Sequence, residues 1–162
     1  MNIKQTPTLS FSEAFNSATS KIFQFNGRAR RSEYWWMMVL LLAVNVILTP
    51  FIGILVDLAT IPLTFRRLHD TGRSGWWWGV YTILRIAFGV SLIYDLVMAS
   101  LNAENMQGYE EELAFALFAK YIIWFVVIGI YKIVLIVFMC MDSNIDENKY
   151  GKSPKYIDSA VQ

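Results

Sequence analysis

The chain has 162 residues, of which 56% are apolar and 17% are charged, against about 45–50% and about 25% in soluble domains. This composition excludes a disordered chain and does not suit a water-soluble domain, because too little polar surface remains to cover it. One Cys and one His exclude a disulfide framework and a Cys/His zinc site, and a net charge of +1 gives no general attraction for nucleic acid. We therefore expect a membrane protein with no metal, no cofactor and no nucleic-acid partner.

Residues 1–33 are predicted to form a cytoplasmic segment that contains an amphipathic helix. Ser10 and Glu13 have the spacing of a capping box, and apolar residues then recur at helical intervals, at Phe11, Phe15, Ala18 and Ile22. Gly27 is expected to end this helix. Two interpretations remain open: the helix lies on the cytoplasmic leaflet, or it packs against the protein itself. No cleavable signal peptide is expected, because residues 1–34 have no apolar core.

Residues 34–141 are predicted to form the membrane domain. Three stretches, 35–65, 76–99 and 113–141, contain only five of the 27 charged residues. A membrane span needs about 20 mainly apolar residues. The second and third stretches each suit one transmembrane helix.

The stretch 35–65 allows two interpretations. Its 31 residues would make a single helix of roughly 46 Å, which is long for one span, and Pro50 near its middle disfavours a continuous helix. The first interpretation is a short re-entrant hairpin with arms at about 35–48 and 51–65. The second is one kinked, tilted helix.

The distribution of basic residues predicts the topology. Residues 1–34 carry five Lys or Arg, the loop 66–75 carries three and the tail carries three, whereas the loop 100–112 carries none and has four Glu. Basic residues in short loops favour the cytoplasmic side. All the basic segments share one side only if 35–65 returns to its starting side. We therefore favour the hairpin, with both termini cytoplasmic.

Residues 142–162 are predicted to form a cytoplasmic tail. Its acidic residues do not have the spacing of a calcium-binding loop, because the required Gly and the final bidentate Glu are missing. We expect a solvated tail with a turn at Tyr150 and Gly151.

Three segments carry a family resemblance: residues 25–35 (FNGRARRSEYW), 66–77 (RRLHDTGRSGWW) and 148–154 (NKYGKSP). Together they resemble the bacterial inner-membrane family known as "domain of unknown function 805", over nearly the whole chain. The resemblance implies a small multi-pass protein of the bacterial cytoplasmic membrane. It implies no established activity, catalytic residue or cofactor. The expected fold is all-α, with four membrane-inserted helices and the N-terminal amphipathic helix.

A cluster of basic residues is the first candidate site. Guanidinium groups suit phosphate oxygens, and these loops would face anionic headgroups. The candidate residues for binding an anion or anionic lipid are Arg28, Arg30, Arg31, Arg66, Arg67, His69 and Arg73. In the alternative interpretation the arginines fix the topology, and Glu33 and Asp70 pair with them to lock the loops. Catalysis by His69 and Asp70 is a weaker alternative, because adjacent helical side chains point about 100° apart.

The charges inside the apolar stretches are the second candidate site. Asp57, Arg85 and Lys132 are each roughly 12–14 Å from the predicted cytoplasmic ends of their spans, so they are predicted to meet at one level. Asp95 and Lys120 are predicted to pair nearer the outside. These residues form either ion pairs that fix helix packing or a path for an ion or proton.

The best-supported function from sequence alone is a non-enzymatic membrane protein that binds anionic lipid or a membrane partner. The first alternative is a small oligomeric transporter or channel that uses the intramembrane charges. The second alternative is an enzyme that acts on a lipid headgroup.

Overall fold

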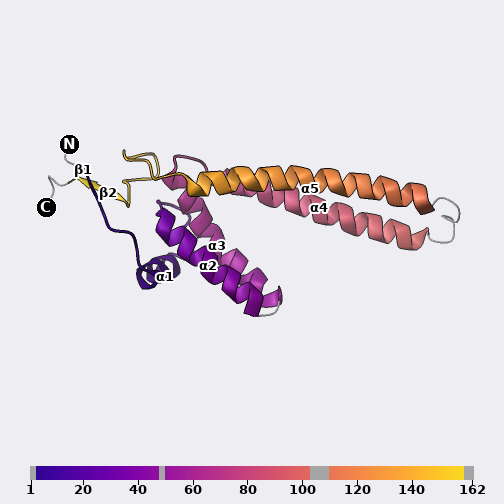
Figure 1. Ribbon diagram of the computed structural model, residues 1–162, viewed down its shortest axis with the longest axis horizontal. Coiled ribbons are helices and arrows are strands. Elements are labelled where there is room, and N and C mark those ends of the chain that lie inside the picture. The colour runs from indigo at the N-terminus through magenta and orange to yellow at the C-terminus, as the bar shows by residue number, and fades with distance from the viewer. Residues whose placement is uncertain (1–2, 48–49, 103–109, 159–162) are drawn as a thin grey trace. The chain divides into compact units, whose positions relative to one another are not determined.

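The computed structural model describes residues 3–47, 50–102 and 110–158 and is mostly helical (Figure 1). Five helices and two short strands occur in this part of the chain. In chain order they are β1 (Ile3–Gln5), α1 (Phe11–Ser20), α2 (Arg31–Ile47), α3 (Pro50–Asp70), α4 (Trp76–Leu101), α5 (Glu110–Cys140) and β2 (Tyr156–Asp158). The helical fold class is confirmed, with the small sheet as an addition that the sequence did not predict.

Helix α1 begins with the predicted capping box. The Ser10 backbone N–H donates to the Glu13 carboxylate at 2.8 Å, and the Ser10 hydroxyl accepts from the Glu13 backbone N–H. These bonds satisfy backbone donors that a helix start leaves free. The helix packs against α2 through Ala14 and Ala18, so packing against the protein is observed.

The expected end of α1 at Gly27 is wrong. The helix ends at Ser20, and Lys21 is its C-cap residue. In the last turn Thr19 Oγ1 donates to the Phe15 carbonyl at 2.7 Å, within the helix. Gly27 instead has φ +92° in the segment that leads to α2.

The stretch 35–65 contains two helices that pack against each other, α2 and α3, rather than one kinked helix. Pro50 is the first residue of α3, where its missing N–H removes no hydrogen bond. Pro62 lies inside the same helix. Their depth in the membrane stays a prediction.

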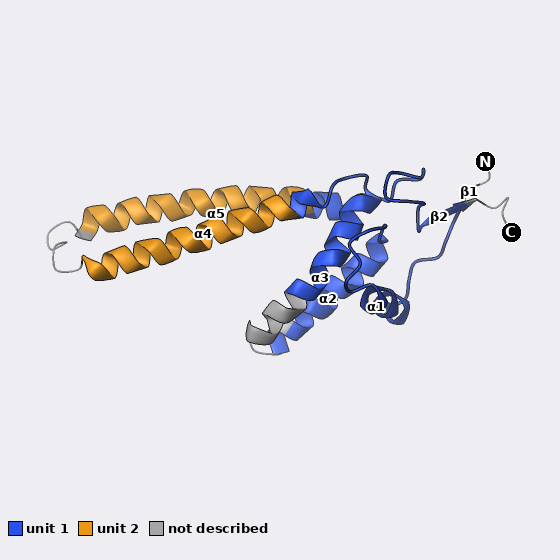
Figure 2. Ribbon diagram, turned by 180° about the vertical axis from the view of Figure 1, so that it is seen from behind, with its two compact units in different colours: residues 1–78, 136–162 blue, residues 79–135 orange. Residues whose placement is uncertain are grey.

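The structure divides into two compact units (Figure 2). Unit 1 comprises residues 1–78 and 136–162, and unit 2 comprises residues 79–135. Unit 1 thus combines the N-terminal segment, α2, α3 and the tail.

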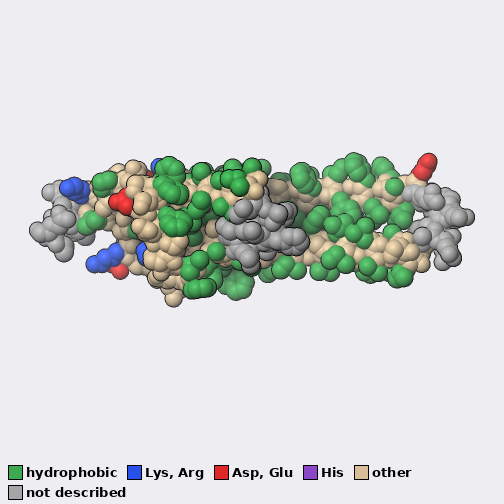
Figure 3. Space-filling view, turned by 90° about the horizontal axis from the view of Figure 1, so that it is seen from below, with side chains coloured by type: hydrophobic (Ala, Val, Ile, Leu, Met, Phe, Trp, Pro, Cys, Tyr) green, Lys and Arg blue, Asp and Glu red, His purple; other side chains and the backbone are tan. Residues whose placement is uncertain are grey.

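Unit 2 is a hairpin of the long helices α4 and α5, held by aromatic contacts such as the stacked rings of Tyr81 and Tyr131, 6.3 Å apart. Two helices of the described chain are long and apolar enough to cross a membrane, and both belong to this hairpin: Trp76–Leu101 and Glu111–Cys140. Apolar side chains lie along its visible surface (Figure 3). Part of the predicted acidic loop, residues 103–109, lies outside the described chain.

The expectation of a solvated tail is wrong in part. β2 pairs antiparallel with β1, with Lys4 opposite Ile157, so the two ends of the chain form one small sheet. Ser143 and Ser153 are buried. The predicted turn is present, with Gly151 at φ +114°. The tail packs because its backbone carbonyls accept hydrogen bonds from buried arginines, which composition alone does not reveal.

Candidate functional site

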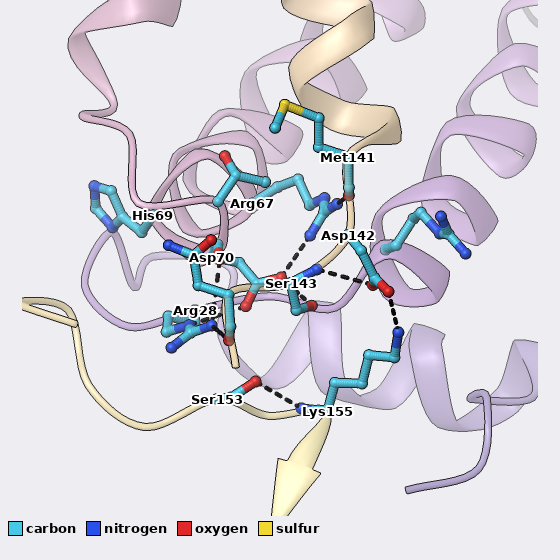
Figure 4. A network of polar contacts seen from close by, with 12 residues as sticks. Arg28, Arg67, His69, Asp70, Met141, Asp142, Ser143, Ser153 and Lys155 are labelled. Atoms are coloured by element: carbon cyan, nitrogen blue, oxygen red, sulfur yellow. Dashed lines mark hydrogen bonds and ion pairs between the residues drawn. The ribbon is translucent and has the colours of Figure 1, made fainter. Parts of the chain in front are cut away.

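A fully buried carboxylate, Asp70, lies at the centre of a network of polar contacts in unit 1 (Figure 4). Arg28 Nε donates to its Oδ1 at 2.9 Å, and Arg67 Nη1 donates to its Oδ2 at 2.5 Å. The Ser143 hydroxyl also donates to Oδ2. Both carboxylate oxygens therefore have charged partners, which is what burial of an ionised acid requires.

The turn after α3 places Asp70 at this centre. Gly72, at φ +76°, donates its N–H to the His69 carbonyl at 3.0 Å, and Arg73 donates its N–H to the Leu68 carbonyl at 2.9 Å. This is the hydrogen-bond pattern of a glycine-ended helix. A Cβ on Gly72 would lie 2.7 Å from the side-chain amide of Asn144, so a side chain there would press on the tail.

The remaining donors of Arg28 and Arg67 bind backbone carbonyls, all but one of which lie in the segment 139–151. Arg28 donates to the carbonyls of Asp70, Asn144, Asp146 and Gly151. Arg67 donates to the carbonyls of Met139 and Met141. Burial lowers the pKa of Arg67, and Asp70 opposes that shift. These two arginines therefore act as internal clamps between segments that are far apart in sequence.

His69 joins the N-terminal segment to the tail. Its ring stacks on Tyr150, with centroids 3.6 Å apart and planes 7° apart, and its Nδ1 lies 3.2 Å from the Gly27 carbonyl oxygen. Asn148 donates to the His69 carbonyl at 2.9 Å. Burial lowers the pKa of His69, and the Gly27 carbonyl opposes that shift.

Arg66 pairs with Glu33, from the first turn of α2. Arg66 Nη1 donates to Glu33 Oε1 at 3.2 Å, and both side chains are almost fully buried. Burial raises the pKa of Glu33 and lowers the pKa of Arg66, while the partner opposes each shift. Within the described chain, Nε and Nη2 of Arg66 are buried without a hydrogen-bond partner.

The other candidate residues of the basic cluster occupy separate positions. Arg30 donates to the Thr6 carbonyl at 3.0 Å, and the exposed Arg31 donates to the Cys140 carbonyl at 3.3 Å. Arg73 lies 4.0 Å from the centre of the Phe138 ring. The seven residues therefore do not form one open site, and Arg66 is the buried member with donors left over.

The intramembrane candidates in unit 2 include one ion pair. Lys120 Nζ and the Tyr121 hydroxyl each lie 2.6 Å from Asp95 Oδ2. Arg85 lies 5.8 Å from the centre of the Tyr81 ring, and Lys132 is exposed on α5. The side chain of Asp57, the predicted partner of these two cations, lies outside the described residues.

Sequence reasoning missed the contribution of the tail. Ser143 and Asn148 bind the Asp70 carboxylate and the His69 carbonyl, and Tyr150 covers the His69 ring. Two of these residues lie in the segment 148–154, which the resemblance had marked without a role. Most of the arginine donors bind backbone carbonyls. Every residue has such a carbonyl, so the side chains in the sequence do not indicate which residues accept these bonds.

Comparison with known proteins places the chain among bacterial membrane proteins. It is 33% identical to the inner membrane protein YhaH of Escherichia coli K12 over 111 residues, which cover 55% of this chain and 88% of YhaH. It is 28% identical to the inner membrane protein YhaI of the same strain over 146 residues, which cover 82% of this chain and 86% of YhaI. No solved structure gives a significant match. The family model for "Protein of unknown function (DUF805)" matches residues 22–56 and 44–152, and the chain belongs to this family.

Proposed function

We propose that this protein is a non-enzymatic protein of the bacterial inner membrane that binds anionic lipid with the N-terminal part of unit 1. The observation that carries the proposal is an exposed aromatic edge formed by Phe11 and Phe15 of α1 and Trp36 of α2. The Phe11 ring lies 6.2 Å from Phe15 and 5.8 Å from Trp36. These side chains are 39–44% exposed, although α1 is docked on α2.

Aromatic rings of this kind favour the headgroup level of a membrane. The edge is held in place, because Trp36 Nε1 donates to the Leu9 carbonyl at 3.1 Å. In water such a cluster is unfavourable, whereas at a membrane surface it lies at the boundary between headgroups and lipid tails. Both earlier interpretations of α1 therefore apply together in this proposal. One face of the helix packs on α2, and the neighbouring exposed face contacts lipid.

An exposed cation on the helix that carries Trp36 favours anionic lipid over neutral lipid. Arg31 lies in the first turn of α2, where its guanidinium donates to the Cys140 carbonyl at 3.3 Å. A basic residue near an anionic membrane surface contributes about 1 kcal/mol to binding.

The contacts of His69 and Asp70 support a non-enzymatic role. Both Asp70 oxygens accept hydrogen bonds from buried arginines, and the His69 ring is covered by Tyr150. Groups held in this way join segments of the fold and are not available to act together as an acid and a base.

The test is native mass spectrometry of the full chain extracted with its own lipids. We expect retained anionic lipid, reduced at least severalfold by the combined change Phe11→Ser and Phe15→Ser, and unchanged by Lys152→Gln, which removes an exposed tail cation. Absence of retained anionic lipid from the parent protein would overturn the proposal. A defined oligomer without lipid would favour the transporter alternative.

A further inference from the structure

A cavity of about 50 Å³ lies within unit 1, next to Arg66. A buried water needs roughly 10–15 Å³ of such volume, so the cavity has room for a small polar group. Residues from α1, from the turn that follows it, from α2 and from α3 line the cavity. Its lining side chains are Ala18, Thr19, Ile22, Met37, Ala59, Thr60, Leu63 and Arg66.

Arg66 is the charged residue that lines this cavity, and only part of its guanidinium group has a hydrogen-bond partner. Its side chain is 1% exposed, and Glu33 accepts from Nη1 alone. Nε and Nη2, which lack a partner in the described chain, are the two donors on one edge of the planar guanidinium. That edge matches two oxygens of a carboxylate or phosphate. Both atoms have almost no exposed surface, so a ligand reaches them when the side chains that line the cavity shift slightly. A buried donor without a partner is unfavourable, so an acceptor at this edge would be stabilising.

The cavity lining selects an amphiphile. Apart from Arg66 and two threonines, the lining side chains are apolar. Inorganic phosphate would lose its hydration against such walls, whereas a lipid brings apolar groups next to its phosphate.

The charges near the cavity favour a ligand with one negative charge. Glu33 neutralises Arg66, and Lys21 lies close enough to Glu33 to lower the pKa of that carboxyl by its charge. One further negative charge therefore balances these three groups.

We propose that this cavity binds the phosphodiester group of a singly charged anionic lipid, with two of its oxygens on Nε and Nη2 of Arg66. The inference rests on the proposed function, because it names one specific site within a lipid-binding unit. It differs from the aromatic edge, which contacts the membrane without selecting a single molecule.

The test uses delipidated full-length protein in neutral detergent. Its thermal unfolding is followed while short-chain phosphatidylglycerol, short-chain phosphatidylcholine or inorganic phosphate is added. We expect a saturable rise in Tm with phosphatidylglycerol, since a ligand that binds only the folded state raises its stability. Equal stabilisation by inorganic phosphate would overturn the lipid assignment, and equal stabilisation by phosphatidylcholine would overturn the selection for charge.

Three variants locate the binding site. Arg66→Gln should weaken phosphatidylglycerol binding at least tenfold, and Arg66→Lys should also weaken it, because lysine keeps the charge but has no two-donor edge. Ala59→Leu should fill the cavity while every charged residue stays in place. If the Arg66 variants do not fold, this variant shows whether phosphatidylglycerol binds in the cavity. Lys152→Gln, which removes one exposed cation, should bind like the parent protein. Unchanged binding in a folded Arg66→Gln or Ala59→Leu variant would overturn the proposal.

The two lipid proposals fail in different ways. If the combined variant Phe11→Ser and Phe15→Ser loses native lipid while Arg66→Gln and Ala59→Leu retain it, the cavity proposal is wrong and the proposed function is supported. If none of these variants changes lipid retention, both fall.

Discussion

Arg28 donates a hydrogen bond to Asp70 at 2.9 Å across 42 residues of sequence, and both side chains are buried. Arg67 binds the other oxygen of the same carboxylate. The triad of Arg28, Arg67 and Asp70 joins the segment before α2, the end of α3 and the tail. It is a fully buried tertiary contact of unit 1, so its removal should lower the stability of the fold.

Asp70→Asn should lower the stability of unit 1 by about 3–5 kcal/mol, because it leaves two buried guanidinium groups without their counter-charge. The measurement is thermal or denaturant unfolding in detergent. The control is Asp142→Asn, which breaks the more exposed ion pair with Lys155 and should cost at most about 1 kcal/mol. Equal effects of the two changes would contradict a structural role for the triad.

His69 should make stability depend on pH. Burial lowers its pKa below the ordinary value of 6.5, so the unfolded chain binds a proton at higher pH than the folded protein. Protonation then favours unfolding, and Tm should fall as the pH drops below about 6.5.

The matched comparison for this pH dependence is His69→Gln. The raised pKa of Glu33 acts in the opposite direction, because the folded protein then gains stability as the pH falls through that pKa. The variant retains Glu33, so subtracting its pH profile isolates the histidine. Parallel profiles of Tm against pH would show that His69 does not titrate with unfolding.

Gly75→Ala should destabilise unit 1. A Cβ at this position would lie 2.1 Å from Phe65 Cδ1, and that ring is itself packed edge-on against Phe25 at 5.3 Å. We expect a loss of about 1–3 kcal/mol, typical of overpacking, measured as a drop in Tm. Gly89→Ala is the control, because a Cβ there meets nothing within 4 Å. A similar drop for both would point to a backbone effect rather than a steric one.

The pair Asp95–Lys120 should behave as a coupled unit in α4 and α5. Lys120→Met leaves the Asp95 carboxylate without its cation, 2.6 Å away in the parent protein, in an apolar hairpin. We expect a lower yield of folded protein from membranes, with recovery in the double variant Asp95→Asn and Lys120→Met. A double variant no better than the single one would show that the two residues act independently.

The sequence by itself determined the helical segments and the membrane class. Apolar stretches poor in charge are a local property, so α4 begins at the predicted Trp76 and α5 covers most of 113–141. The capping box at Ser10 is equally local and is present as predicted. The end of α1 was not predictable in the same way, because the apolar residues continue at helical spacing to Ile22, beyond the last helical residue, Ser20.

Only the tertiary structure decided what each arginine does. Arg28, Arg66 and Arg67 have the same side chain and each lies in a basic segment, so residue type predicted one shared role. All three are buried, and their partners distinguish them. Arg28 and Arg67 meet a carboxylate and backbone carbonyls from distant segments, whereas Arg66 meets a single glutamate and a cavity. The free energy of a buried charge depends on the partners that folding brings to it, and a linear sequence does not record them.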